Sequence, residues 1–147
     1  MRHYLVREIM SRPAIVIEWG ASVLDASALM EERDVRRLPV VDDENFVIGI
    51  VSSGDVREAT SVYHTANPYA PDQDEILLAV DEVMTTPALT VGPEEPVLNV
   101  VRLMMEHKVG GVPVVDENNH PLGMITVSDI FRLLIQNWEQ IENEAAG

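Results

Sequence analysis

The chain has 147 residues, of which 46% are hydrophobic, and 25 acidic against 10 basic side chains give a formal net charge of −15. This length suits one compact domain, or two small halves that share a core, better than two independent domains. The negative charge disfavours nucleic acid and anionic membranes as partners, because both attract Lys and Arg. The absence of cysteine excludes disulfides, thiolate catalysis and cysteine zinc sites.

No apolar run reaches the roughly 18 residues that a membrane-spanning helix needs. A charged region followed by an apolar one, as in a secretory signal, is also not found at the start. We therefore expect a soluble, cytoplasmic protein. The four histidines are scattered, and no nucleophile–base–acid set can be assembled, so we expect neither a metal site nor a catalytic site.

The first predicted elements are a short strand and an amphipathic helix. Residues Ile15 to Ile17 form a β-branched run, which favours a strand. Ser22, with Asp25 three residues later, is typical of a capped helix start. Apolar residues then recur at the spacing of one buried helix face, at Val23, Ala26, Leu29 and Met30.

A hairpin and a second helix follow. The β-branched runs 38–41 and 47–51 are separated by an acidic, Asn-bearing turn at 42–45, which predicts two antiparallel strands. A helix opens near Ser52. We expect residues 61–79 to form a connector, because they include the polar, proline-bearing stretch YHTANPYAPDQDE.

The remaining chain repeats this pattern at a constant offset. The segment VDEVMTTPALT from Val80 aligns with VREIMSRPAIV from Val6, an offset of 80 − 6 = 74 residues. Without a gap, the same offset places VPVVDENNHPLGMITVSDI from Val112 over LPVVDDENFVIGIVSSGDV from Leu38. The sequence therefore contains two copies of one unit. We assign these copies to residues 1–60 and 80–147.

The second copy predicts the same elements in the same order. Pro96 stands where a first helical residue is favoured, and apolar residues at helical spacing follow it at Val97, Val100, Leu103 and Met104. Strands are expected at 112–115 and 122–125, joined by a turn at 116–119. A helix opens near Thr126, and the last helix is expected to run from Asp129 to the Trp138 region before the acidic tail frays.

Each copy has the order β-α-β-β-α, which makes the protein α/β in the α+β sense. A single copy would leave one sheet face and one helix stripe exposed to water. We therefore expect the two copies to pack against each other about a pseudo-twofold axis. Clefts between the copies are then the expected places for a ligand, since pockets favour interfaces between structural units.

The order of elements, the doubled LPVVD/VPVVD segment and the repeated Gly-x-x-Ser/Thr-x-x-Asp together resemble a tandem pair of cystathionine beta-synthase (CBS) domains, or Bateman module. The resemblance covers nearly the whole chain. It implies a non-catalytic regulatory module with no obligatory cofactor, which binds AMP, ADP, ATP or S-adenosylmethionine between the repeats. It also implies a homodimer and a separate effector protein.

By this resemblance, Asp55 and Asp129 hold a ribose, while Ser52 and Thr126 lie near ribose or phosphate. An ionised carboxylate can accept hydrogen bonds from both ribose hydroxyls. The alternative role is structural, because Ser or Thr followed three residues later by an acid is also a helix capping pattern. Both roles can coexist, since a helix N-terminus also favours phosphate.

Arg36 and Arg37 are candidates for contact with a phosphate. In the regulatory subunit of AMP-activated kinase, which belongs to the family that the sequence resembles, a basic pair at the matching positions contacts phosphate. Arginine suits this role because its guanidinium binds phosphate through two hydrogen bonds. The alternative is a solvated pair or salt bridges to nearby glutamates. Gly110 and Gly111 replace the pair in the second copy, so the two clefts are not expected to be equivalent.

An adenine ring would need an apolar slot. The candidate side chains are Ile15, Val16, Leu38, Ile50, Leu89, Val112 and Met124. The alternative for each of them is an ordinary place in the core. For the whole protein, the alternative to ligand sensing is a ligand-independent dimerisation or docking scaffold, in which the motifs serve as caps and turns.

Overall fold

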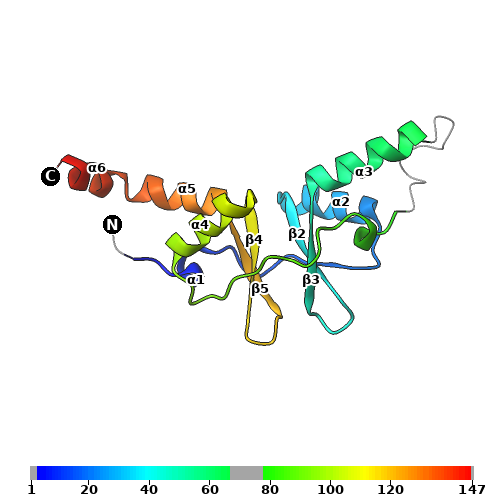
Figure 1. The fold of residues 1–147 in the computed structure, drawn as a ribbon, viewed down its shortest axis with the longest axis horizontal. Helices are drawn as coiled ribbons and strands as arrows, with labels where there is room; N and C mark the ends of the chain where they lie inside the picture. Colours follow the sequence, from blue (N-terminus) through cyan, green and yellow to red (C-terminus); the bar gives the residue numbers. More distant parts are fainter. Residues whose placement is uncertain (1–2, 67–77, 147) are drawn as a thin grey trace. The chain divides into compact units, whose positions relative to one another are not determined.

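The computed structural model describes residues 3–66 and 78–146, which form helices around two small sheets (Figure 1). The first repeat contains β1 (Ile17–Glu18), α2 (Val23–Arg33), β2 (Arg37–Val41), β3 (Val47–Ser52) and α3 (Ser53–Ala66), after the short helix α1 (Val6–Ile9). The second contains η2 (Val80–Glu82), α4 (Val97–His107), β4 (Gly111–Val115), β5 (Pro121–Thr126), α5 (Val127–Gln136) and α6 (Trp138–Ala146). The expected mixture of helices and hairpins is confirmed.

The two sheets follow the predicted hairpins. In the first, β2 pairs with β3 antiparallel and with β1 parallel, and Ile17 lies opposite Val40. In the second, β4 and β5 pair, and the first strand is reduced to a parallel bridge between Val91 and Val114. These two residues lie 74 positions after Ile17 and Val40. The second repeat therefore keeps the position of the first strand but not its length.

The helix starts and hairpin turns follow local sequence chemistry. The Ser22 hydroxyl accepts a hydrogen bond from the Asp25 amide at 3.0 Å, as the capping pattern predicts. Asn45 and Asn119 adopt positive φ values of 66° and 64° in the hairpin turns, a conformation that asparagine tolerates. Pro96 is the residue that precedes α4, one position earlier than predicted.

A helix opens at Thr126 as predicted, but the predicted end of the last helix is wrong. The helix α5 begins at Val127, two residues before Asp129, and it ends at Gln136. The Asn137 side chain donates to the Leu133 carbonyl at 2.9 Å and marks the break. The acidic tail then forms α6 instead of fraying. Its glutamate, glutamine and alanine residues favour a helix, and Trp138 Nε1 donates to Glu142 Oε1 one turn later at 2.7 Å.

The chain packs as two compact units, and their boundaries cross the repeat boundaries. The first unit consists of Ile15–Ala88 with Asn119–Pro121, and the second consists of Met1–Ala14, Leu89–Asn118 and Leu122–Gly147. The expected division into 1–60, 61–79 and 80–147 followed the sequence repeat alone. Within the expected connector, residues 61–66 continue α3, and residues 67–77 lie outside the described residues.

Each repeat begins with a segment that precedes its first strand and contains Val6 in the first repeat and Val80 in the second. Main-chain hydrogen bonds hold this leading segment in the unit that the other repeat forms. The Val80 amide donates to the Ala21 carbonyl at 2.7 Å in the first unit, and the Val6 amide donates to the Glu95 carbonyl at 2.9 Å in the second. The Val80 and Val6 side chains are fully buried. Each therefore completes the apolar core of the unit that it joins.

Each unit has its own hydrophobic core, formed by the inner faces of its helices and strands. The first core contains Ile17, Val23, Ala26, Met30, Leu38, Val40, Val51, Val56 and Val80. The second contains Val6, Val91, Val97, Val100, Met104, Val112, Val114, Ile125 and Leu133. Core residues lie directly beside the strand-to-helix turns after β3 and β5, Val51 and Val56 in the first unit and Ile125 in the second, and these turns carry the predicted Ser/Thr and Asp residues.

Candidate functional site

The strand-to-helix turn of the first repeat forms a capping box between Ser52 and Asp55. The Ser52 amide donates to Asp55 Oδ2 at 2.8 Å, and the Asp55 amide donates to the Ser52 hydroxyl oxygen at 3.1 Å. These bonds satisfy backbone groups at the start of α3. Within residues 3–66 and 78–146, Asp55 Oδ1 accepts no hydrogen bond. Capping therefore leaves one carboxylate oxygen of Asp55 available to a ligand.

The matching turn in the second repeat holds its carboxylate on both sides. The Thr126 amide and hydroxyl donate to Asp129 Oδ2 at 2.8 and 3.1 Å. The Ser11 hydroxyl donates to Asp129 Oδ1 at 3.2 Å, and Arg132 Nη1 donates to the same oxygen at 3.0 Å. Asp129 is 3% exposed. An ionised carboxylate accepts about four hydrogen bonds, so Asp129 has its full number of partners.

The sequence explains the part of this difference that is due to Arg132, since the Ser11 hydroxyl has a hydroxyl counterpart in Thr85. The residue 74 positions before Arg132 is Glu58, which cannot donate to a carboxylate when it is ionised. The residue that matches Ser11 is Thr85, and its main chain pairs with Ile50 as the Ser11 main chain pairs with Met124. The backbone arrangement is thus repeated, whereas the side chains that saturate Asp129 are not.

Arg36 and Arg37 stand next to the Ser52–Asp55 turn in the first sheet. Arg37 is directly opposite Ser52 in the antiparallel pair of β2 and β3, so their side chains project from the same face of the sheet. The carbonyl of Arg36 accepts a hydrogen bond from the Ser53 amide at 2.9 Å. The first unit thus brings the side chains of Arg37 and Ser52 to one face of the sheet beside Asp55, while Arg36 is held there by its main chain.

Neither arginine forms an ion pair with a carboxylate in the described part of the chain, including the nearby Glu31 and Glu32. The salt-bridge alternative to a phosphate role is therefore not realised there. In the second repeat the Gly110 carbonyl accepts from the Val127 amide at 3.0 Å, the same backbone bond without a basic side chain. The Asp129 turn has Arg132 as its neighbouring cation, and this cation is bound to the carboxylate itself.

The predicted adenine-binding side chains divide by burial. Leu38 and Val112 are fully buried in the two cores, and Met124 is 9% exposed, which favours the core alternative for these three. Leu89 is half-buried against the second core. The side chains that keep partial exposure in the same unit as Asp55 are Ile15, Val16 and Ile50.

The glycines of the two motifs are needed because of close backbone approach. A Cβ atom at Gly49 would lie 2.6 Å from Met84 Sδ and 2.8 Å from the Thr85 carbonyl oxygen. At Gly123 a Cβ atom would overlap the Ser11 carbonyl oxygen. These contacts give both glycines a structural role, because another segment of the chain approaches each strand too closely for a side chain to fit.

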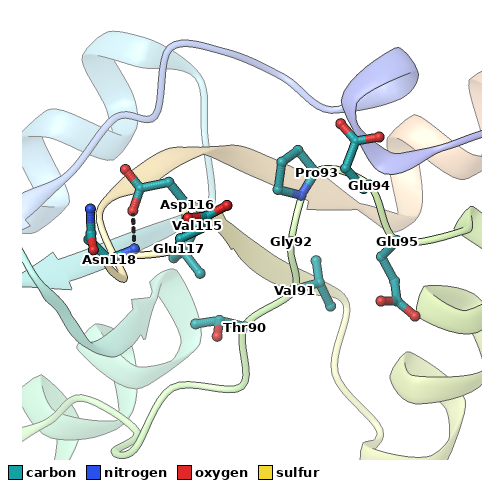
Figure 2. Close-up of a pocket in the computed structure, with 10 residues that line it drawn as sticks. All are labelled: Thr90, Val91, Gly92, Pro93, Glu94, Glu95, Val115, Asp116, Glu117 and Asn118. Atoms are coloured by element: carbon teal, nitrogen blue, oxygen red, sulfur yellow. Dashed lines mark hydrogen bonds between the residues drawn. The ribbon is translucent and has the colours of Figure 1, made fainter.

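The second unit also contains a hollow of about 760 Å³ that none of the predicted residues line (Figure 2). Its walls are formed by Thr90, Val91, Gly92, Pro93, Glu94, Glu95, Val115, Asp116, Glu117 and Asn118. Four carboxylates in this set oppose a bound phosphate, since like charges repel. Arg7 Nε pairs with Glu94 Oε1 at 3.0 Å and offsets one of them.

In the first repeat, two side chains form a bridge across the place that corresponds to this hollow. Trp19, which matches Pro93, donates from Nε1 to Asp43 Oδ1 at 3.2 Å, and Asp43 matches Glu117. The proline in the second repeat cannot form this bridge. Our sequence interpretation missed the hollow, and the exchange of tryptophan for proline is the signal that could have indicated it.

Comparison with known proteins places the chain in a family. The sequence matches the CBS domain over residues 6–61 and again over residues 80–136, so the chain belongs to the CBS domain family. The two matched segments start 74 residues apart, as the internal repeat does. The predicted family is confirmed.

Related sequences include short and long proteins. A CBS domain-containing protein from Dictyostelium discoideum is 31% identical over 143 residues, which cover 93% of this chain and 95% of that protein. An L-aspartate semialdehyde sulfurtransferase from Methanocaldococcus jannaschii is 30% identical over 129 residues, which cover 88% of this chain and 23% of the enzyme. The chain therefore spans about a quarter of the length of such enzymes.

Solved structures confirm the fold class. The CBS domain pair of protein MJ0100, in complex with 5′-methylthioadenosine and S-adenosyl-L-methionine, matches with a TM-score of 0.80 at 29% identity. The match covers 92% of this chain and 99% of that one. CBSX2 from Arabidopsis thaliana, in complex with AMP, matches with a TM-score of 0.74 at 28% identity, over 90% of this chain and 97% of that one.

No helix in the described segments is long and apolar enough to cross a bilayer. No group of three or more His, Cys, Asp or Glu side chains there is arranged to hold a metal ion.

Proposed function

We propose that this chain is a non-catalytic regulatory module that binds an adenosine-containing ligand and signals to a separate partner protein. Two solved relatives carry adenosyl compounds, S-adenosylmethionine with methylthioadenosine in one and AMP in the other. The observation that carries the proposal is Asp55 Oδ1, next to Ser52 and Arg37, which accepts no hydrogen bond from the described residues. A carboxylate acceptor for ribose hydroxyls and a cation for phosphate lie together there.

The charge of the chain narrows the choice of ligand. With a formal net charge of −15, the chain repels a polyanion unless cations lie at close range. Arg36 and Arg37 offset one or two negative charges, which suits AMP better than ATP. S-adenosylmethionine carries a positive sulfonium and is attracted by the same field. We therefore propose AMP-like or cationic adenosyl ligands.

We also propose that the module forms a homodimer through the outer face of α5 and its continuation. Phe131 and Ile135 are 58% and 76% exposed and lie four residues apart on one face of α5, and Trp138 at the start of α6 is 52% exposed. Exposed apolar side chains that gather on one surface are typical of a contact with another protein. A second copy of the chain would cover it.

The second candidate function is a ligand-independent scaffold. The capping boxes at Ser52 and Thr126 favour it, because they give both motifs a structural role without any ligand. Under this alternative, ligands change neither the melting temperature nor the oligomeric state. The two functions therefore differ in a direct binding measurement.

Calorimetric titration with AMP, ATP and S-adenosylmethionine tests the proposal. Asp55→Asn keeps an amide oxygen that can accept from the Ser52 amide, but it removes the charge that favours ribose. We expect this variant to bind at least about tenfold more weakly. Asp25→Asn is the matched control, because it makes the same change at the same helical position of α2. Absence of heat with all three compounds would leave only the scaffold.

A further inference from the structure

The two aspartates of the repeated motif differ in how many hydrogen bonds they can still accept. Asp129 accepts four, from Thr126 twice, from Ser11 and from Arg132, and it is buried. Asp55 accepts one hydrogen bond from its own cap within the described residues and is half-buried. A ribose presents two hydroxyl donors, and they need acceptor capacity that remains at Asp55 alone.

The hydroxyl groups beside the two aspartates differ in the same sense. The Thr126 hydroxyl donates its proton to Asp129 Oδ2. The Ser52 hydroxyl accepts from the Asp55 amide, which leaves its proton available to a phosphate or ribose oxygen. The turn of the first repeat therefore has a free acceptor and a free donor. The turn of the second repeat has neither.

We propose that the chain binds one adenosyl ligand through the Asp55 turn, and that Arg132 and Ser11 prevent the Asp129 turn from binding a second. This inference rests on the proposed function, since it assigns the sensing to one of two repeats. Ligand binding at Asp129 requires ribose hydroxyls to replace a charged donor, Arg132, and the hydroxyl of Ser11. Such an exchange contributes little net free energy of binding, because one set of hydrogen bonds is broken for each set that forms.

The position of Arg132 explains why it acts as an internal competitor. It lies three residues after Asp129 on α5, on the same face of the helix, and reaches the carboxylate without spanning other elements. Its side chain is 62% exposed, so solvent screens part of the attraction. Ser11 comes from the N-terminal segment and supplies the second bond to Oδ1. We therefore expect a moderate effect from Arg132 alone and a larger one from both residues.

The test is the stoichiometry of AMP and of S-adenosylmethionine, measured by calorimetry at fixed salt. The wild-type chain should bind about one ligand, and Asp55→Asn should remove that binding. Arg132→Gln should add a second site at the Asp129 turn, which should bind the ligand about tenfold more tightly than the same turn does in the wild type. Ser11→Ala combined with Arg132→Gln should raise it further. Arg102→Gln is the control, because it removes the same charge from the exposed face of α4.

A reciprocal variant tests the same inference in the first repeat. Glu58→Arg places an arginine three residues after Asp55, as Arg132 follows Asp129. We expect it to weaken the wild-type site about tenfold. Urea unfolding of each variant checks that the fold is retained, which is expected because residues 58, 102 and 132 are exposed.

The outcomes separate this inference from the proposed function. Two equal sites in the wild type, or one site unchanged in both Arg132→Gln and Glu58→Arg, would overturn the inference while the ligand-binding function stands. Binding that survives Asp55→Asn but is lost in Asp129→Asn would overturn it as well. If no variant binds either compound, the proposed function is wrong and the inference falls with it.

Discussion

The turns after β3 and β5 have the same backbone arrangement and different side-chain environments. In both, an aspartate accepts from the amide of a Ser or Thr three residues earlier, at 2.8 Å in each case. Asp129 has additional partners in Ser11 and Arg132, whereas Asp55 has none among the residues that the structure describes. A capping motif is local and survives duplication of the sequence. The availability of its carboxylate depends on residues outside the motif, and these differ between the repeats.

The outer helix faces of the two repeats differ in the same way. Phe131 and Ile135 of α5 are exposed and apolar, while the matching residues of α3 are Arg57 and Ser61. At these two positions the first repeat is polar, and its Asp55 can still accept a hydrogen bond. The second repeat is apolar there, and Asp129 has its full number of partners. The two proposals above thus assign ligand binding to the first repeat and self-association to the second.

The largest loss of stability is expected from a methyl group added at the motif glycines Gly49 and Gly123, where the leading segments pack against the strands. In Gly123→Ala the new Cβ would overlap the main-chain carbonyl of Ser11, whereas in Gly49→Ala the nearest atom is Sδ of the flexible Met84 side chain and the Thr85 carbonyl oxygen lies farther away, at 2.8 Å. We expect the free energy of unfolding to fall by about 3 kcal/mol for Gly123→Ala and by about 1 to 2 kcal/mol for Gly49→Ala. Urea unfolding measures both.

Gly20→Ala is the control for this pair, because nothing lies within 4 Å of the added Cβ. It should leave the urea midpoint within error of the wild type. Equal losses of stability for Gly49→Ala and Gly123→Ala would show that the two leading segments accommodate an added methyl group equally well. That result would contradict the difference described above.

An intermediate effect is expected from removing each motif carboxylate. Asp129→Ala leaves the Thr126 amide, the Ser11 hydroxyl and Arg132 without their acceptor, and we expect a loss of about 2 to 3 kcal/mol in stability. Asp55→Ala removes a cap alone and should cost about 1 kcal/mol. Thermal and urea unfolding without ligand measure the difference. If the two variants are equally stable, the additional partners of Asp129 contribute nothing.

The smallest effect on stability is expected at the exposed face of α5. Phe131→Arg introduces the residue type of the first repeat, and it should change the free energy of unfolding of the monomer by less than about 0.5 kcal/mol. It should nevertheless weaken self-association at least about tenfold, because a charge replaces an aromatic anchor in the proposed interface. Sedimentation equilibrium measures this dissociation constant.

Ser27→Arg on α2 adds the same charge at an exposed position of the first unit and should leave self-association unchanged. Raising the salt concentration should strengthen the dimer of the wild type and of this control, since each chain carries a formal net charge of −15 in the wild type. A dimer that tolerates Phe131→Arg would place the interface elsewhere on the chain.

The sequence was sufficient for the repeat, the hairpins and the capped helix starts, because each depends on residues close together in the chain. The offset of 74 residues predicted two copies of one unit, and the family match begins at the same spacing. The Ser22 cap and the β2–β3 pairing followed from local patterns. The end of α5 did not follow from such a pattern, since the helical spacing of apolar residues does not indicate that the helix is interrupted at Asn137.

Only the tertiary structure decided where the leading segments pack and which carboxylate is free. Val6 completes the core of the second unit and Val80 that of the first, although the sequence assigns each to the other repeat. Ser11 reaches Asp129 across 118 residues of chain. Contacts of this range depend on the packing of whole elements. Local propensity and spacing can therefore indicate a motif, but they cannot say which groups will occupy it.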